Sequence, residues 1–493
     1  MINFNLNRFI LRDNFIEGEV WIPKEKFEKV RSQLKGLGKE FHDATFHDTE
    51  EAKETVPTYF KSNEFIFPFQ EIVNTYGVPR YREANPALFT IVTFPFLFGV
   101  MFGDIGHGLL LLLFASYLCF NRDELIANNS ALKPALKARY LLLLMGFFAF
   151  FAGWMYNDFL SIPINLFGSC YVNEGEVAVK KIKECVYPFG MDPKWYVASN
   201  ELSFFNSLKM KMSVILGVTQ MLAGIVLRGM NAVYFNNYVD FIFEFVPQLV
   251  FMTLLFGYMN IMIFIKWGTD WSRDPSKAPS IITLLMNIFL KGGSVDNKPV
   301  LGSTEFQESM NFYFLIICLI CIPLILIPKP ILTFRKLSKE NSEKHKHSHE
   351  HYQPLQENED EKRVIKSHDE HQESIADLFV HQSIETIEFV LGSISNTASY
   401  LRLWALSLAH AQLAKVFFEK SLLGFIQEGN LILVIVGFFI FTNITFAVLM
   451  CMDLMECFLH TLRLHWVEFQ NKFYKADGVK FNPYSFKIIV ETD

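Results

Sequence analysis

Long apolar stretches separated by short polar segments fill most of the chain from Pro86 onward. A helix needs about 20 mostly apolar residues to cross a bilayer, because the hydrocarbon core is about 30 Å thick and each residue adds about 1.5 Å. The pattern therefore predicts an all-α fold, a polytopic membrane protein with eight transmembrane helices. We place these spans at two short helices within 86–120 and at 140–162, 212–234, 241–265, 312–327, 387–418 and 431–462.

Two local signals set span boundaries. The Gly-rich run GDIGHG, at Gly103 to Gly108, interrupts the first apolar stretch, and we expect it to turn a tight helical hairpin. Pro328 and Pro330 follow the sixth span. We expect them to end that helix, because proline cannot continue the backbone hydrogen-bond ladder.

An even number of spans places both termini on the same side of the membrane. Residues 1–86 are polar, with no apolar stretch behind a basic start, so we expect them to stay in the cytosol. Within them, Glu17 to Ile22 has the pattern of a strand and Lys24 to Leu37 that of an amphipathic helix. The predicted organisation is a cytosolic segment 1–86, transmembrane helices one to six in 87–328 with luminal loops near 163–208 and 267–310, a charged cytosolic linker 329–386, helices seven and eight in 387–463, and a cytosolic tail 464–493.

Composition narrows the class of protein. Only 19% of the 493 residues are charged, against roughly 25% in ordinary soluble domains, so a single soluble enzyme is excluded. The 15% aromatic content also excludes a disordered chain. A net charge of −6 gives no basic excess for nucleic acid. We find no phosphate-binding loop, dinucleotide fingerprint or nucleophile elbow, and so expect no cofactor and no ATP hydrolysis by this chain.

Cysteine and histidine patterns leave two questions open. Cys170 and Cys185 fall in a predicted luminal loop, where they form either a disulfide or two separate thiols. The run KHKHSHEH, at Lys344 to His351, lies in the charged linker. Such runs can bind metal, but this one lacks ligand spacing, and we favour a solvated loop. No metal site is predicted.

Arg402 is the strongest functional signal inside the apolar spans. It lies near the middle of the seventh span, too deep for its side chain to reach the headgroups easily. An arginine at that depth costs about 2.5 to 3.5 kcal/mol on insertion scales and stays protonated. Its partner must come from another helix or another subunit.

Other ionisable residues accompany Arg402 on the last two spans. Glu388 and Arg402 fall on nearly the same helical face, roughly 21 Å apart, and His410 lies about 80° round from Arg402. On the eighth span, steps of three, four and three residues draw one polar stripe, made of Asp453, Glu456, His460 and Arg463. We expect such a stripe to face protein or water, and staggered groups of this kind suit a proton path.

Structural explanations compete with this functional one. The same residues could form salt bridges that hold helices together, and groups near span ends can extend to the interface. Asp104 could cap a helix beside Gly103. Lys266 and Arg228 could anchor their spans at the membrane surface.

Five strings give the chain its resemblance to a known family, the membrane-embedded a subunit of eukaryotic V-type proton-pumping ATPases. They are YREANPALFTIVTFPFLFGVMFGDIGHG (Tyr81 to Gly108), KMKMSVILGV (Lys209 to Val218), TIEF (Thr386 to Phe389), TASYLRLWALSLAHAQL (Thr397 to Leu413) and LRLHWVEFQNKFY (Leu462 to Tyr474). The resemblance covers the chain from about Phe15 to the C-terminus.

The resemblance implies roles for individual residues. Arg402 matches the arginine that faces the carboxylates of the rotating proteolipid ring, and Arg463 matches the second arginine of the last span. The residues that match half-channel positions are Glu388, His410, Asp453 and His460. Asp104 matches the aspartate of the first hairpin, and Lys266 the lysine after the fifth span.

It also implies partners and a location. The family pumps protons from the cytosol into an acidified lumen, through the Vo sector, while other subunits hydrolyse ATP and turn the ring. The implied partners are the proteolipid c ring and other Vo subunits, the peripheral stalk, the V1 ATPase sector and membrane lipids. The implied location is the membrane of acidified organelles (vacuole, lysosome, endosome or Golgi) or the plasma membrane, with the last two helices tilted against the ring.

The chain departs from the family pattern in three respects. Residues 1–80 resemble only the returning end of a larger N-terminal cytosolic domain, either because the rest was lost or because the chain is incomplete. Asp453 stands where the family usually has glutamate. The residues Glu385, Gly392 and Asn396 replace others near Glu388, often His, Asn and His. Two rival functions remain, a transporter or channel that works alone and a purely structural stator.

Overall fold

The computed structural model describes residues 9–12, 15–37, 55–61, 63–128, 132–174, 178–182, 184–271, 275–296, 298–349 and 375–482. These residues belong to two compact units. The first unit is formed by Met1–Asn85 and Lys475–Asp493, and the second by Pro86–Tyr474. Apart from two short β-hairpins and isolated bridges, the described elements are helical, as an all-α membrane protein requires.

The first unit joins the two ends of the described chain. Its elements are β1 (Ile10–Arg12), β2 (Phe15–Glu17), a 3-10 turn η1 (Lys24–Lys26), α2 (Phe27–Leu37) and α3 (Phe67–Tyr76). The strand predicted over Glu17 to Ile22 is wrong, because β2 ends at Glu17 and the next residues are not strand. Parallel bridges join Thr58 to Lys480 and Val78 to Asp477, so the C-terminal segment pairs with the N-terminal part of this unit.

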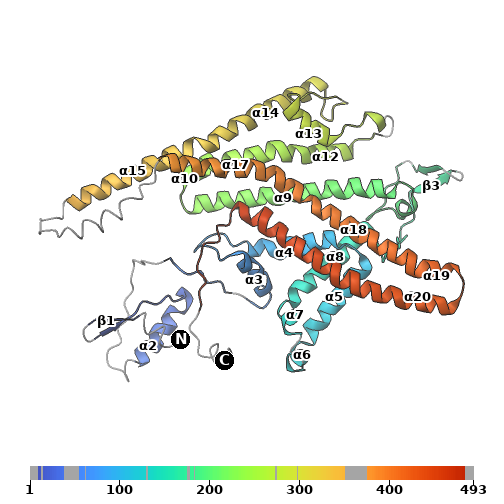
Figure 1. The fold of residues 1–493 in the computed structure, drawn as a ribbon, viewed down its shortest axis with the longest axis horizontal. Helices are drawn as coiled ribbons and strands as arrows, with labels where there is room; N and C mark the ends of the chain where they lie inside the picture. Colours follow the sequence, from blue (N-terminus) through green and yellow to red (C-terminus); the bar gives the residue numbers. More distant parts are fainter. Residues whose placement is uncertain are drawn as a thin grey trace. The chain divides into compact units, whose positions relative to one another are not determined.

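The second unit begins with the predicted hairpin, α4 (Ala87–Met101) and α5 (Ile105–Phe120), which is confirmed. Helix α5 packs along α8 (Arg139–Tyr156) at very close range (Figure 1). A Cβ atom built on Gly153 would lie 2.3 Å from the backbone N of Ile105, and one on Gly108 would lie 2.5 Å from the N of Phe150. Small residues allow this approach, as at many helix contacts in membranes.

Helix α8 ends at Tyr156, earlier than the predicted Ile162. Asn157 adopts a left-handed conformation, with φ of 54°, and so closes the helix. The following loop contains β3 (Tyr171–Glu174), β4 (Ala178–Lys181) and the 3-10 turn η2 (Pro193–Val197). Cys170 and Cys185 are joined by a disulfide in this loop, which decides between the two alternatives that the sequence left open.

Three longer helical segments follow. They are α9 (Glu201–Tyr234), the continuous helix α10–α12 (Tyr238–Gly268) with π-helical turns η3 (Phe241–Phe245) and η4 (Thr253–Gly257), and α14 (Thr304–Leu326). A short apolar helix, α13 (Ile281–Leu290), lies in the loop predicted at 267–310. It packs through Leu284 and Ile288 against Tyr258 and Met262 of α12.

The predicted end of the sixth span before Pro328 is confirmed, because α14 ends at Leu326 and the chain bends at Ile327. A new helix, α15 (Pro328–His349), starts at once after this bend, and Thr304–Lys336 forms one long apolar segment. Proline is tolerated in the first turn of a helix, because the amide that it lacks would have no partner there. The run Lys344 to His351 begins on the end of α15, and neither its side chains nor residues 350–374 are among those that the structure describes.

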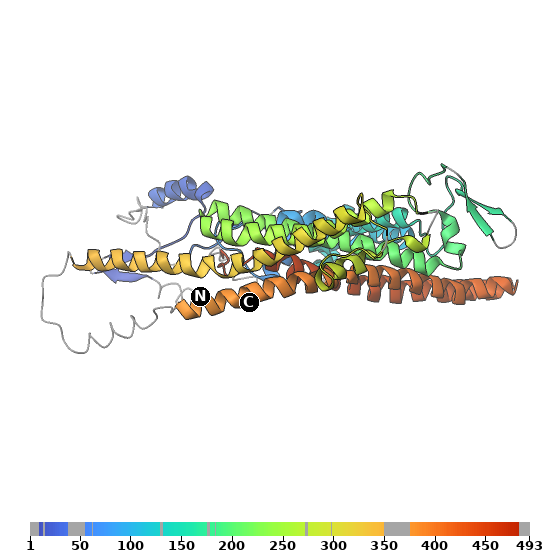
Figure 2. The same ribbon diagram turned by 90° about the horizontal axis from the view of Figure 1, so that it is seen from above.

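The last helices form a long pair along one edge of the second unit (Figure 2). The first member is α17 (Ile375–Ser399) and α18 (Leu401–Phe418), joined at Tyr400 and continued by η6 (Glu419–Leu423) and α19 (Gly424–Gln427). The second is one helical run made of α20 (Leu431–Ile444), the π-helix η7 (Thr445–Asp453), α21 (Leu454–Arg463), the π-helix η8 (Leu464–Phe469) and the 3-10 turn η9 (Gln470–Lys472).

Five of the described helices are long and apolar enough to cross a membrane. They are Arg139–Tyr156, Glu201–Tyr234, Tyr238–Gly268, Thr304–Lys336 and Leu431–Lys472. Helices α4, α5 and α13 are apolar but shorter. The membrane class is therefore supported, and the count of eight spans stays a prediction.

Candidate functional site

His410 on α18 and Asp453 at the end of η7 face each other inside the second unit. Nδ1 of the imidazole lies in hydrogen-bonding contact with Oδ2 of the carboxylate. The exposed fraction is 1% for His410 and 6% for Asp453, so both groups are shielded from solvent. These two predicted site residues thus form one buried pair.

Asp104 and His107 join this pair from the start of α5. Asp104 caps the helix, because its Oδ1 accepts hydrogen bonds from the backbone N of Gly106 at 2.7 Å and of Leu160 at 3.2 Å. Its Oδ2 lies 2.8 Å from Nδ1 of His107. The rings of His107 and His410 are 5.2 Å apart, centroid to centroid. We call the four residues Asp104, His107, His410 and Asp453 the acid–histidine cluster.

Lys209 and Asp158 border the cluster, and the sequence reasoning missed both. Asp158 is close enough to Asp104, His107 and Lys209 to interact electrostatically. The Lys209 ammonium lies 4.5 Å from the centre of the Tyr156 ring and donates to the carbonyl of Ser407 at 3.3 Å. The hydropathy pattern started the fourth span at Met212, whereas α9 starts at Glu201, so Lys209 lies well inside the helix and is buried.

A second group gathers around Arg402. Arg463 and Glu468 interact with it electrostatically, and His460 is close to both arginines. The Nη1 atom of Arg402 is buried and has no hydrogen-bond partner among the described residues. Glu468 is buried as well, at 1% exposure. The sequence reasoning missed Glu468 because it ended the last span near Leu462, whereas the helical run continues to Lys472.

The predicted polar stripe divides between the interior and the surface. Its four residues cover an arc of about 80° at 100° per residue. Asp453, at one side of the arc, is buried, and His460, about 20° away, is half-buried. Glu456 and Arg463, about 60° and 80° away, are exposed. One helix therefore serves both the buried cluster and an outer face.

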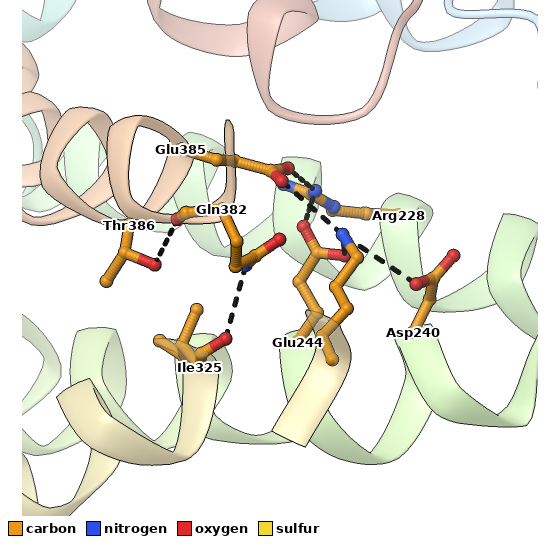
Figure 3. A network of polar contacts seen from close by, with 8 residues as sticks. Arg228, Asp240, Glu244, Ile325, Gln382, Glu385 and Thr386 are labelled. Atoms are coloured by element: carbon orange, nitrogen blue, oxygen red, sulfur yellow. Dashed lines mark hydrogen bonds and ion pairs between the residues drawn. The ribbon is translucent and has the colours of Figure 1, made fainter. Parts of the chain in front are cut away.

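A network of charges ties α17 to its neighbours near Glu388 (Figure 3). Arg228 of α9 contacts Glu244 of η3 and lies 2.8 Å from Oε1 of Glu385 on α17. Lys329 of α15 lies 2.8 Å from Glu244, 3.4 Å from Glu385 and 3.7 Å from Asp240. Glu385 is one of the residues that depart from the family pattern, and here it supplies a carboxylate shared by two cations.

Glu388 and Lys266 lie outside these contacts. Glu388 is exposed on α17, one turn from Glu385, and interacts electrostatically with Lys472. Lys266 ends α12 and donates from Nζ to the carbonyl of Pro279 at 2.7 Å. It contacts the loop before α13 and lies near Lys211 of α9, apart from the acid–histidine cluster and the Arg402 group.

The arrangement separates groups that exchange protons from groups that do not. Histidine and carboxylate side chains can each take up and release a proton, whereas a guanidinium stays protonated. Along α17 and α18 the order is Glu388, then Arg402, then His410, so a fixed positive charge stands between two sets of titratable groups.

Known proteins resemble the chain over most of its length. A model of the V-type ATPase 116kDa subunit family matches residues 1–486. The V-type proton ATPase subunit a3 of Arabidopsis thaliana is 42% identical over 90% of the chain and 54% of its own length. The vacuolar proton translocating ATPase 100 kDa subunit of Dictyostelium discoideum is 42% identical over 96% and 58%, and the human V-type proton ATPase 116 kDa subunit a 4 is 39% identical over 96% and 61%.

The chain thus spans between 54% and 61% of the length of these three relatives. The family match itself covers far more than half of the chain, and it agrees with the long apolar helices and with the strings that the last two helices carry. This chain belongs to the V-type ATPase 116kDa subunit family.

Proposed function

We propose that the chain is the proton-translocating stator of the Vo sector of a V-type proton ATPase. Eight transmembrane helices cross the bilayer, and both termini lie in the cytosol. The last two helices lean against a rotating proteolipid c ring. The chain is not catalytic, since ATP is hydrolysed in the V1 sector, which a peripheral stalk connects to this stator. The pump acidifies an organelle or acts at the plasma membrane.

One observation carries the proposal: two arginines stand at an apolar outer face without an ion pair among the described residues. Arg463 is exposed and Arg402 is half-buried. The helices of this pair also expose apolar side chains, among them Leu391 at 63% and Ile394 at 50% on α17 and Leu459 at 55% on α21. Lipid does not solvate guanidinium groups, so such a face calls for a partner that brings carboxylates into the membrane. A ring of acidic proteolipids has that chemistry.

The two sides of Arg402 give the proton separate routes. Glu388 belongs to the cytosolic entry and is exposed on the same outer face of α17. The acid–histidine cluster belongs to the luminal exit, with His410 and Asp453 as its core. Arg402 favours the ionised form of the arriving ring carboxylate, and its permanent charge prevents protons from passing directly between the half-channels. His460 and Arg463 line the approach, and Lys266 holds the luminal loop.

Replacing Arg402 tests the proposal. Arg402→Ala in the assembled pump should abolish ATP-driven acidification of membrane vesicles, while the amount of assembled complex stays near that of the unsubstituted protein. Lys420→Ala is the matched control, because Lys420 is an exposed cation further along the same helical run. Normal acidification by Arg402→Ala would refute the proposal.

A further inference from the structure

Three members of the acid–histidine cluster have the chemistry of metal ligands. Asp104, His107 and His410 each offer one ligand atom, and these atoms all lie within 4.8 Å of one another. The exposed fractions are 0%, 1% and 1%. A tetrahedral zinc ion with ligands at about 2.0 to 2.2 Å holds its ligand atoms about 3.3 to 3.6 Å apart, so Oδ2 of Asp104 and Nδ1 of His107, now at 2.8 Å, would separate slightly and the more distant atoms would approach.

The side-chain atoms that face this point are free to coordinate. Oδ1 of Asp104 is occupied by two backbone amides, whereas Oδ2 contacts Nδ1 of His107, another atom of the cluster, at 2.8 Å. Nε2 of His107 and Nε2 of His410 are buried and have no hydrogen-bond partner among the described residues. Leaving a buried polar atom unpaired costs about 1 to 3 kcal/mol, so a ligand that satisfies several of them at once gains affinity.

Asp453 orients one of these ligands. Its carboxylate contacts Nδ1 of His410, which leaves Nε2 of the same ring for a metal. Histidine ligands in metal sites commonly hold a carboxylate on the second nitrogen in this way, which fixes the ring and raises its basicity. The local charge also suits a cation, because the cluster holds two carboxylates, Asp104 and Asp453, against one bordering ammonium, Lys209.

We propose that Asp104, His107 and His410 form a binding site for a divalent transition-metal ion, with zinc as the preferred ion, and that the bound ion inhibits proton exit. Two imidazoles and one carboxylate select zinc over magnesium or calcium, which prefer oxygen ligands alone. Zinc binding follows from the geometry of this chain alone. Inhibition of proton exit rests on the proposed function, since the ion blocks the nitrogen of His410 that would carry the proton.

Zinc binding to the metal-free assembled pump, without ATP, tests the site. All proteins would carry His345, His347, His349 and His351 replaced by Asn, so that the His-rich run binds no zinc. The protein with only these four replacements is the background protein. We expect one zinc ion per chain, and at least about a tenfold loss of affinity for His107→Gln and for Asp453→Asn. His381→Gln, an exposed histidine on α17, is the control and should bind like the background protein.

X-ray absorption of the zinc-loaded complex gives a readout that needs no variant. Two imidazoles and oxygen ligands are expected. If the background protein and His107→Gln bound zinc equally, or if the zinc had mostly sulfur ligands, the proposed zinc site would be refuted.

Inhibition of proton exit is tested by measuring the acidification rate with and without zinc, compared within each protein. If zinc binds but the acidification rate of the background protein does not change, inhibition is refuted. If Arg402→Ala acidifies normally, the proposed function is refuted, but one zinc ion per chain is still expected.

Discussion

His410 and Asp453 contact each other directly, although 43 residues and the turn between α19 and α20 separate them in the chain. Their contact joins α18 to the π-helical end of η7 in the interior of the second unit. A buried imidazole and carboxylate in this relation can pass a proton between them, and each leaves a costly unpaired group if the other is removed.

Proton transport should therefore tolerate a longer side chain at position 453 better than the loss of the carboxylate charge. We expect Asp453→Asn to slow ATP-driven acidification at least about 100-fold, the lower end of the range for loss of a proton-transfer group, and Asp453→Glu to slow it less. The measurement is the initial acidification rate of vesicles, divided by the amount of assembled complex. Glu428→Gln, in an exposed position between α19 and α20, should leave the rate unchanged. A larger loss for Asp453→Glu than for Asp453→Asn would contradict the assignment.

The stability that the charge network around Arg228 gives the chain should depend most on Glu244, its buried acid. The Glu244 side chain is 4% exposed and that of Glu385 is 30% exposed, so water screens only the second. We expect Glu244→Ala to destabilise the purified chain by about 3 to 5 kcal/mol and Glu385→Ala by about 1 kcal/mol. Unfolding midpoints in one detergent, at one scan rate, would order the variants.

A double replacement separates pairing from packing in this network. Arg228→Met combined with Glu244→Met removes both charges and keeps bulk, so it should cost less than Glu244→Ala. If the double variant unfolds at a lower temperature than Glu244→Ala, the contact of Arg228 with Glu244 does not stabilise the second unit in the way described.

Two glycines should respond to alanine with opposite signs. A Cβ on Gly153 would lie 2.5 Å from the carbonyl carbon of Asp104, so Gly153→Ala must push the start of α5 away from α8. We expect a loss of about 1 to 3 kcal/mol, as for other overpacked sites. Gly392→Ala has no atom within 4 Å of the new Cβ and lies inside α17, where it should stabilise by up to about 1 kcal/mol. Shifts of the same sign in the two unfolding midpoints would refute this.

The pairing of the C-terminal segment in the first unit should weaken in acid. Nε of Arg80 donates to Oδ1 of Asp477 at 2.5 Å, and this hydrogen bond holds the pKa of the Asp477 carboxyl below its usual range. A carboxyl with a lowered folded pKa stabilises the fold above its unfolded pKa, about 3.9, and loses that contribution as pH falls through the folded value. Both side chains are about half exposed, so the contribution is about 0.2 to 1 kcal/mol.

Amide hydrogen exchange would measure this pH dependence. Asp477→Asn should reduce the protection of the Gly478 and Phe481 amides, which donate to Val78 and Thr58, by up to about fivefold at pH 6. The difference between the two proteins should shrink towards pH 2.5, after correction for intrinsic exchange. Glu19→Gln, an exposed acid in the same unit, is the control. A difference that stays constant or grows in acid would contradict the role of the ionised Asp477.

The sequence by itself determined the apolar helices, the break in the first hairpin and the unusual position of Arg402. These follow from local chemistry, since hydropathy over about 20 residues and glycines between two apolar runs act without distant partners. The same local rules did not predict α15, which starts at Pro328 directly after the sixth span, and they missed Lys209 and Glu468, which lie on polar extensions of apolar helices.

Only the tertiary structure decided which ionisable groups meet. Helical periodicity gives the face on which His410 or Glu385 lies, but not the helix that packs against it. His410 meets His107 and Asp453, and Glu385 meets Arg228 and Lys329, through contacts between segments far apart in the chain. Charges inside a membrane protein are stable only with such partners. Helix packing therefore decides which residues form a proton path, a metal site or a structural ion pair.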